Sequence, residues 1–149
     1  MPHTNPIEAS LSAAADRAGD ITALVYDRLF ATQPDMRAEF WRDGSGAIRG
    51  EMLSRVLETI LDLAGPRAYA HQMIECEIIT HDAYGIPRSV FTTFFATVAG
   101  SVEAAAGPDW TPAMANAWAA LLTEVDTIVA RAPGPEMPAG ANDPVAKTQ

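Results

Sequence analysis

One histidine, His81, lies where the sequence is best suited to hold a chemically active side chain. Residues 77–91 are E-I-I-T-H-D-A-Y-G-I-P-R-S-V-F, in which Gly85 ends one helix and Pro87 begins the next. His81 therefore occupies the last turn of a helix, beside a sharp corner between two apolar segments. A neutral imidazole in this position is a good ligand for a metal ion or haem iron. Taken alone, however, such a histidine is more often structural.

Other side chains with metal-binding chemistry lie near His81 in the sequence. His71, Glu75 and Asp82 fall near one helix face, and Glu77 precedes His81 by four residues. A carboxylate–histidine metal site in a helical bundle uses such spacing, but it also needs ligands on other helices, which the sequence does not reveal. A solvated acidic face is the better interpretation of these residues. The chain has no phosphate-binding glycine loop, no C-x-x-C pair and no H-E-x-x-H zinc helix.

Length, composition and charge narrow the class of protein. A chain of 149 residues with 48% apolar residues can form one domain with a sizeable core. The net charge of −9 argues against partners that are polyanions, namely nucleic acid and anionic membrane surfaces. Cys76 is the only cysteine, which excludes an internal disulfide and suits a reducing compartment. The longest uncharged stretches, 89–102 and 110–123, are too short to span a bilayer, and no signal peptide is evident. We therefore expect a soluble, cytoplasmic protein.

The elements that must position His81 are predicted to be helices throughout. Apolar residues recur at helical spacing, and no strand-like alternation or internal repeat is present. Capping residues, glycines and prolines divide the pattern into helices over about 6–18, 21–33, 34–40, 48–65, 69–81, 87–107 and 112–131. We predict an all-α domain of roughly six to eight helices over residues 1–131. Residues 132–149 are rich in Pro, Gly and Ala and are expected to form a disordered tail.

Three separated motifs give the chain a resemblance to a known family. They are V-Y-D-R-L-F-A-T-Q-P-D-M-R-A-E-F, H-D-A-Y-G-I-P and G-P-D-W-T-P-A-M-A-N-A-W. In this order and spacing they resemble a bacterial single-domain globin, that is, the globin domain of a flavohaemoglobin without its reductase. The resemblance covers about residues 20–130 and implies a globin fold around a pocket for haem b.

The resemblance also implies roles for individual residues. His81 matches the proximal ligand to haem iron, and Phe40 matches the aromatic residue that packs on the haem. Tyr26 matches the tyrosine whose hydroxyl faces the bound gas. Trp110 and Trp118 match aromatic residues that fix the last helix.

The alignment of the helix across from His81 with the family needs a choice of register, because the loop before this helix is one residue shorter than in the family. An ungapped alignment from Leu53 to His81 places Arg49 at the distal position, where the family usually has glutamine or histidine. Leu53 would then form the apolar wall above the gas. A slip of one residue would substitute Gly50 or Ile48. Arg49 could point inward or pair with a haem propionate, and we favour the propionate because burying an unpaired guanidinium is costly.

Two further departures concern the proximal side. The family braces its proximal histidine with a tyrosine and a glutamate, whereas this chain has Phe91 at the tyrosine position and Pro133 near the glutamate position. A histidine without that brace donates less electron density to iron, so the strong peroxidase-like effect of the family is not implied.

The function implied by the resemblance is reversible binding of O₂, NO or CO, as in oxygen transport, buffering, sensing or NO detoxification. No reductase domain follows residue 130 in this sequence. NO dioxygenase or peroxidase-like turnover would therefore require a separate electron-donor reductase. The alternative from another class is a haem-free helical module that regulates other proteins through direct contacts.

Overall fold

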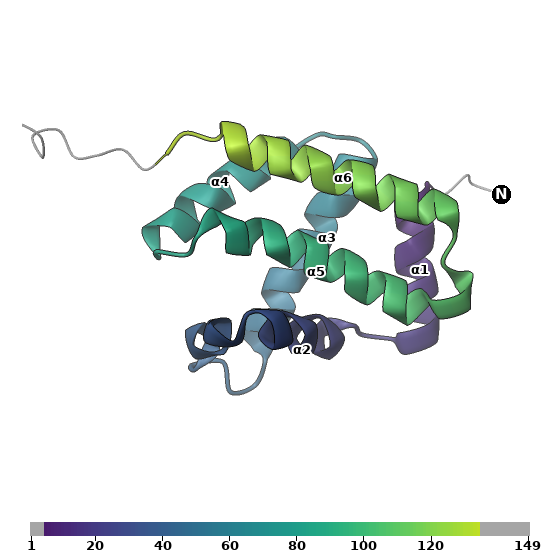
Figure 1. Cartoon of the computed structure of the whole chain (residues 1–149), viewed down its shortest axis with the longest axis horizontal. Coiled ribbons are helices and arrows are strands. Elements are labelled where there is room, and N and C mark those ends of the chain that lie inside the picture. Colours follow the sequence, from purple (N-terminus) through teal and green to yellow (C-terminus); the bar gives the residue numbers. More distant parts are fainter. Residues whose placement is uncertain (1–4, 135–149) are drawn as a thin grey trace, which may run out of the picture.

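The described part of the chain is built from helices and contains no strand. The computed structural model describes residues 5–134. Its elements are α1 (Pro6–Ala18), α2 (Thr22–Thr32), η1 (Pro34–Phe40), α3 (Ala47–Ala64), α4 (Ala70–Ala83), α5 (Arg88–Ala106), η2 (Gly107–Asp109) and α6 (Pro112–Arg131), where η denotes a 3₁₀ helix (Figure 1). The predicted all-α fold class is confirmed.

The first and last α-helices begin with side-chain caps. The Asn5 side chain accepts a hydrogen bond from the Glu8 N–H, and the Thr111 hydroxyl accepts one from the Met114 N–H. A cap of this kind satisfies a backbone donor that has no partner within the helix.

Two buried carboxylates accept hydrogen bonds from the backbone N–H groups at the start of α3 and α4. Asp43, which is 5% exposed, accepts hydrogen bonds from the N–H groups of Ile48 and Arg49 at the start of α3. Asp62, which is 4% exposed and lies near the end of α3, accepts hydrogen bonds from three successive N–H groups, those of residues 68–70, at the start of α4. Asp62 therefore joins the end of one helix to the beginning of the next.

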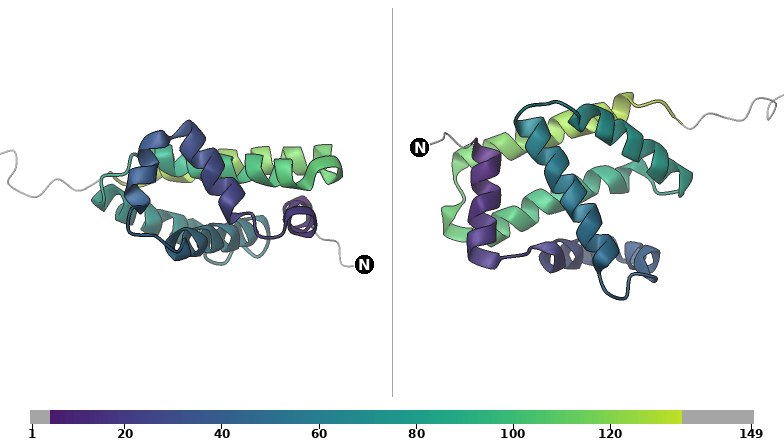
Figure 2. Two further views of the ribbon diagram at one scale, coloured as in Figure 1. Left: turned by 90° about the horizontal axis from the view of Figure 1, so that it is seen from below. Right: turned by 180° about the vertical axis from the view of Figure 1, so that it is seen from behind.

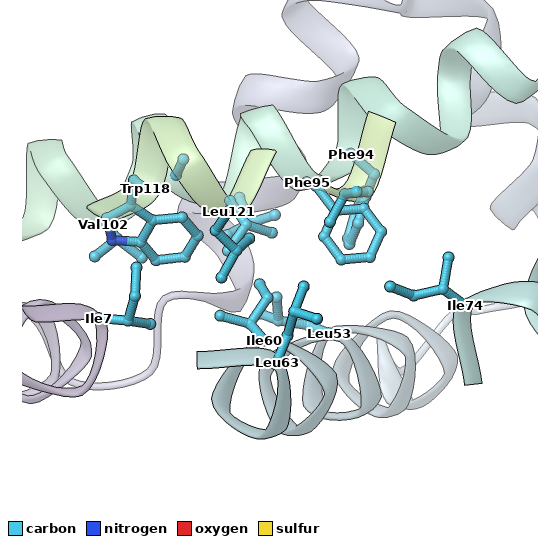
Figure 3. Packing of buried hydrophobic residues seen from close by; sticks show 14 of the residues in the cluster. Ile7, Leu53, Ile60, Leu63, Ile74, Phe94, Phe95, Val102, Trp118 and Leu121 are labelled. Carbon is cyan, nitrogen blue, oxygen red and sulfur yellow. The ribbon is translucent and has the colours of Figure 1, made fainter. Parts of the chain in front are cut away.

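The core forms around α5, which packs against α1, α2, α4 and α6. Val98 and Val102 on α5 are fully buried. Figure 3 shows α5 and α6 facing α1, α3 and α4 across a continuous layer of side chains, which includes Ile7, Leu53, Ile60, Leu63, Ile74, Phe94, Phe95, Val102, Trp118 and Leu121. The indole N–H of Trp118 donates to the Ser10 hydroxyl at 2.8 Å, so the polar atom of this buried residue is satisfied.

The same central helix is apolar enough to raise the question of a membrane. Among the described residues, one segment, Arg88–Asp109, could cross a bilayer by length and composition alone. This is weak evidence, because the core helix of a soluble protein meets the same criterion, and α5 supplies many of the buried residues here.

The corner between α4 and α5 is held to the end of α6. Gly85 has φ +73°, a conformation that favours glycine, and allows the sharp turn that the sequence predicted. Arg88, at the start of α5, pairs with Asp82 and also donates to the carbonyl oxygens of Val129, Ala132 and Pro133.

Two residues that the sequence assigned to the tail are therefore contacted by the folded domain. Ala132 is 9% exposed and belongs to the core, and Pro133 accepts its hydrogen bond from Arg88. Residues 135–149 of the predicted tail lie outside the described residues.

Candidate functional site

A large apolar cavity lies between α3 and α4, which move apart from the loop that joins them (Figure 2). Figure 2 (right) shows these two helices separating, and the cavity between them has a volume of about 620 Å³. It is lined by Leu29 of α2, η1, the loop after it, the N-terminal two thirds of α3, α4 from Met73 onward and the first half of α5. This volume lies within the range that is typical of small-molecule and cofactor pockets.

His81 lines this cavity, and its ring has a defined orientation. Nδ1 lies 2.7 Å from the carbonyl oxygen of Glu77, one turn earlier on α4. A neutral imidazole that donates from Nδ1 keeps the lone pair of Nε2 for a metal ion. The ring of Phe91 packs edge-on against the imidazole at 5.1 Å between centroids. The structure thus places His81 on an apolar cavity with one ring nitrogen available.

Phe40 is the second expected site residue that lines the cavity. It lies at the end of η1, and its ring contacts the rings of Tyr26 at 5.5 Å and Phe30 at 5.9 Å. Helix α5 contributes Phe94 and Phe95 to the lining of the same cavity. His81 and Phe40 are therefore brought to one cavity from elements about forty residues apart.

Tyr26 does not lie where the resemblance placed it. It is 2% exposed and is not among the residues that line the cavity. Its hydroxyl donates to the carbonyl oxygen of Arg49 at 3.0 Å, and burial raises the pKa of its phenol well above the ordinary value. Its ring packs among Phe30, Phe40 and Phe94. The structure thus gives Tyr26 the environment of a core residue that supports the start of α3.

Arg49 and Leu53 also lie away from the cavity. The Arg49 guanidinium binds Asp43, with Nε 3.0 Å from Oδ2 and Nη2 3.2 Å from the backbone carbonyl oxygen. Leu53 is 2% exposed and lines a second, smaller cavity of about 420 Å³ formed with α1 and the start of α2. Asp43 binds the first turn of α3 and so fixes how this helix is rotated. As a result, Arg49 and Leu53, the two residues that the ungapped alignment placed beside the gas, lie on faces of α3 that do not line the first cavity.

The α3 residues that do line the cavity follow the alternative register. Ile48 is the outcome of the one-residue slip, and it lines the cavity together with Met52 and Val56 on the next two turns. The resemblance to the family did not predict Met52, Val56 or the other two cavity methionines, Met36 and Met73. The sequence signal that could have found Met52 and Val56 is that they follow Ile48 at steps of four residues, at positions 52 and 56.

Charged and exposed aromatic residues surround the cavity. Trp41 is 74% exposed and Tyr84 is 78% exposed, although both contribute to its lining. Two cations, Arg42 and Arg55, also line it. Arg55 lies 3.1 Å from Glu51, and Arg42 lies over the Trp41 ring. The cavity thus has charged groups on an otherwise apolar boundary.

The residues fit haem better than a bare metal ion. Within residues 5–134, no group of three or more His, Cys, Asp or Glu side chains could hold an ion. One imidazole with an available nitrogen, walls of phenylalanine and aliphatic side chains, and charged residues beside them form the donor set that suits an iron porphyrin with two propionates.

Comparison with known proteins assigns no family. The chain matches no protein-family model, no curated protein and no solved structure. Function must therefore be argued from the geometry of the site.

Proposed function

We propose that this chain is a globin-like protein that holds haem b in the cavity between α3 and α4 and reversibly binds a diatomic gas. The observation that supports this most is His81, which lines an apolar cavity with Nδ1 engaged by the Glu77 carbonyl. That hydrogen bond would orient the imidazole so that Nε2 serves as the axial ligand to iron. Bound haem would supply iron with a coordination position open to O₂, NO or CO.

The other cavity residues would bind the porphyrin and exclude water. Phe40, Phe91, Phe94 and Phe95 would pack on its apolar faces and edges. Arg42 and Arg55 are the cations in the lining, and we propose that they pair with the two propionates, a contact for which a guanidinium is well shaped. Arg49 is not proposed for this contact because its guanidinium binds the buried carboxylate of Asp43, whereas the partner of Arg55 at 3.1 Å is the exposed Glu51.

The proposed role is storage, transport or sensing of the gas in the cytoplasm. The net charge of −9 and the single, exposed Cys76 are compatible with a cytoplasmic setting. NO dioxygenase or peroxidase-like turnover would need electrons from a separate reductase. Phe91, which contacts His81 through its ring alone, provides no hydroxyl to make the imidazole more electron-rich.

The test is a titration of the purified full-length chain with hemin. We expect a Soret band that saturates at one hemin per chain, and a ferrous CO complex whose spectrum is that of histidine-ligated haem. A featureless titration at micromolar hemin would contradict the proposal and favour the haem-free helical module. The exposed Trp41 and Tyr84 at the cavity would then be the natural candidates for protein contacts.

A further inference from the structure

We infer that the cavity does not stabilise bound O₂ relative to the less polarised gases CO and NO, because α3 directs no free hydrogen-bond donor at a gas other than Arg55, which we assign to a haem propionate. This inference rests on the proposed function and specifies the ligand of the same site. It follows from the hydrogen bonds of four polar groups on or beside the cavity, within the described residues.

The first donor is the Tyr26 hydroxyl, the group expected from the sequence to face the gas. It donates to the Arg49 carbonyl at 3.0 Å, and Tyr26 is absent from the cavity lining. A hydroxyl has a single proton to donate, so this hydrogen bond leaves Tyr26 with none for a ligand. The bond is also protected from water, since Tyr26 is 2% exposed.

The second donor is the Arg49 guanidinium, at the position where the family carries a polar distal residue. Its Nε and Nη2 bind the carboxylate and the carbonyl of Asp43. The carboxylate of Asp43 also holds the N–H groups of Ile48 and Arg49, so it is tied to the first turn of α3. The guanidinium would have to abandon a nearly buried carboxylate to reach the cavity, which is unfavourable.

The α3 surface that remains is apolar or already hydrogen-bonded. Ile48, Met52 and Val56 present hydrocarbon and a thioether, neither of which donates. Thr59 donates to the Arg55 carbonyl at 2.7 Å, and Arg55 itself pairs with Glu51. The Arg55 side chain is 59% exposed, lies 3.1 Å from Glu51 and 3.9 Å from Glu77, and is the residue proposed to pair with a propionate. Apart from Arg55, the α3 side chains that line the cavity offer no free donor to a gas.

The chemical consequence differs between gases. O₂ takes electron density from ferrous haem and becomes a strong acceptor, whereas CO is polarised far less. A hydrogen bond to a charged acceptor is among the strongest in proteins, so its absence weakens O₂ selectively. CO binding depends mainly on space and apolar surroundings, which this cavity provides.

The test compares O₂ and CO release from the hemin-loaded, reduced protein and three variants. Tyr26→Phe is expected to change either rate by less than about threefold, because its hydroxyl is used elsewhere. Met52→Gln adds an amide donor of similar size and is expected to slow O₂ release by about tenfold or more, with CO release within about threefold. Met52→Leu is the matched control and should leave the ratio of the two rates unchanged.

A second readout needs no gas kinetics. The infrared C–O stretch reports the polarity around bound CO, and we expect it to be unchanged in Tyr26→Phe and shifted to lower frequency in Met52→Gln. The haem-free Tyr26→Phe variant should melt at a lower temperature than the haem-free wild type, because the Arg49 carbonyl loses its donor.

Three outcomes separate the inference from the function on which it rests. A protein that takes up no hemin contradicts both. A protein that takes up hemin but releases O₂ at least about tenfold faster in Tyr26→Phe, with CO unaffected, contradicts only the inference and places the hydroxyl in the cavity. The inference is supported if hemin binds, Tyr26→Phe is silent for both gases and Met52→Gln slows O₂ alone.

Discussion

The buried hydrogen bonds around Arg49 show how one residue can fix the surface that α3 presents to the cavity. Its backbone carbonyl accepts from Tyr26, its N–H donates to Asp43, and its guanidinium binds the same carboxylate. The carbonyl, the N–H, Nε and Nη2 of Arg49 are therefore all directed toward α2 or the loop 41–46. The next residue back, Ile48, is consequently the one that lines the cavity.

Arg49→Leu is the prediction that follows at the residue scale. Azide affinity of the ferric haem protein should stay within about threefold of wild type, because the guanidinium does not line the cavity. The melting temperature should fall, because the carboxylate of Asp43 is 5% exposed and would lose its ion pair. A tenfold or larger loss of azide affinity, measured by optical titration, would show instead that Arg49 reaches the ligand. Arg37→Leu, on η1, serves as the control.

At the scale of helices, Arg88 links the corner after His81 to the end of α6. It pairs with Asp82, the residue after His81, and donates to the carbonyl oxygens of Val129, in the last turn of α6, and Ala132, directly after that helix. Such carbonyls need a donor, and a cation is also favourable at a helix C-terminus. Arg88 thus braces the end of α4 in a chain that has Phe91 and Pro133 at or near the positions where the family it resembles has a tyrosine and a glutamate.

Arg88→Met is expected to destabilise the fold by about 1.5–3 kcal/mol, since several hydrogen bonds to a charged donor are lost together. Urea denaturation monitored by circular dichroism would measure this difference. Arg131→Met changes an exposed arginine at the same helix end and should cost much less. Equal effects of the two substitutions would mean that general charge near α6 matters, not the specific contacts of Arg88.

The connection between α3 and α4 depends on Asp62 and is expected to be sensitive to acid. Burial alone would raise the pKa of Asp62, but hydrogen bonds from three backbone N–H groups and the nearby Arg67 outweigh it and hold the pKa below the ordinary value of 3.8. Because the folded pKa is depressed, the stabilisation is complete above the unfolded value and is lost as pH falls through the folded value. The contribution of Asp62 to the melting temperature should therefore not change with pH near neutrality and should decline below about pH 4.

Asp62→Asn should remove part of that acid sensitivity and lower the melting temperature at pH 7. Thermal melts between pH 7 and pH 2.5 on wild type, Asp62→Asn and the exposed control Asp126→Asn would measure it. If the melting temperature of Asp62→Asn falls with acid as steeply as that of wild type, the acid sensitivity belongs to other carboxylates, such as Asp43, whose pKa is also lowered.

For the whole molecule, the helices could be predicted from the sequence because their signals are local. Apolar spacing, Thr111 as a cap and the Gly85–Pro87 corner all act within a few residues, and each predicted helix is present. The contacts of Asp43, Asp62 and Arg88 could not be predicted in this way, because their partners are set by how the helices meet. Arg88, for example, binds carbonyls more than forty residues away.

The candidate site was predicted in part for the same reason. His81 and Phe40 lie at helix ends that motifs mark, and the structure brings both to one cavity. The expected roles of Arg49 and Leu53 depended on the register of α3, which is set by the hydrogen bonds of Asp43 across a loop of altered length. One hydrogen bond to the Arg49 carbonyl directs the Tyr26 hydroxyl away from the cavity.

Haem should also stabilise the molecule as a whole. The lining of the cavity comes from η1, α3, α4 and α5, which are brought together only in the folded protein. A ligand that fills the cavity therefore binds the folded state and not the unfolded chain. At a free hemin concentration one hundred times the Kd, the stabilisation should be about 2.7 kcal/mol. Differential scanning calorimetry at increasing hemin should show a rising melting temperature. A constant melting temperature would contradict specific binding.

The most direct measurement is the Soret spectrum of hemin-loaded His81→Gly, with and without added imidazole. If Nε2 of His81 is the axial ligand, His81→Gly should bind hemin weakly with an altered spectrum, and free imidazole should restore the wild-type band. His71→Gly, on the exposed face of the same helix, should be indistinguishable from wild type. An unchanged Soret band and hemin affinity in His81→Gly would contradict the proposal that this cavity holds haem through His81.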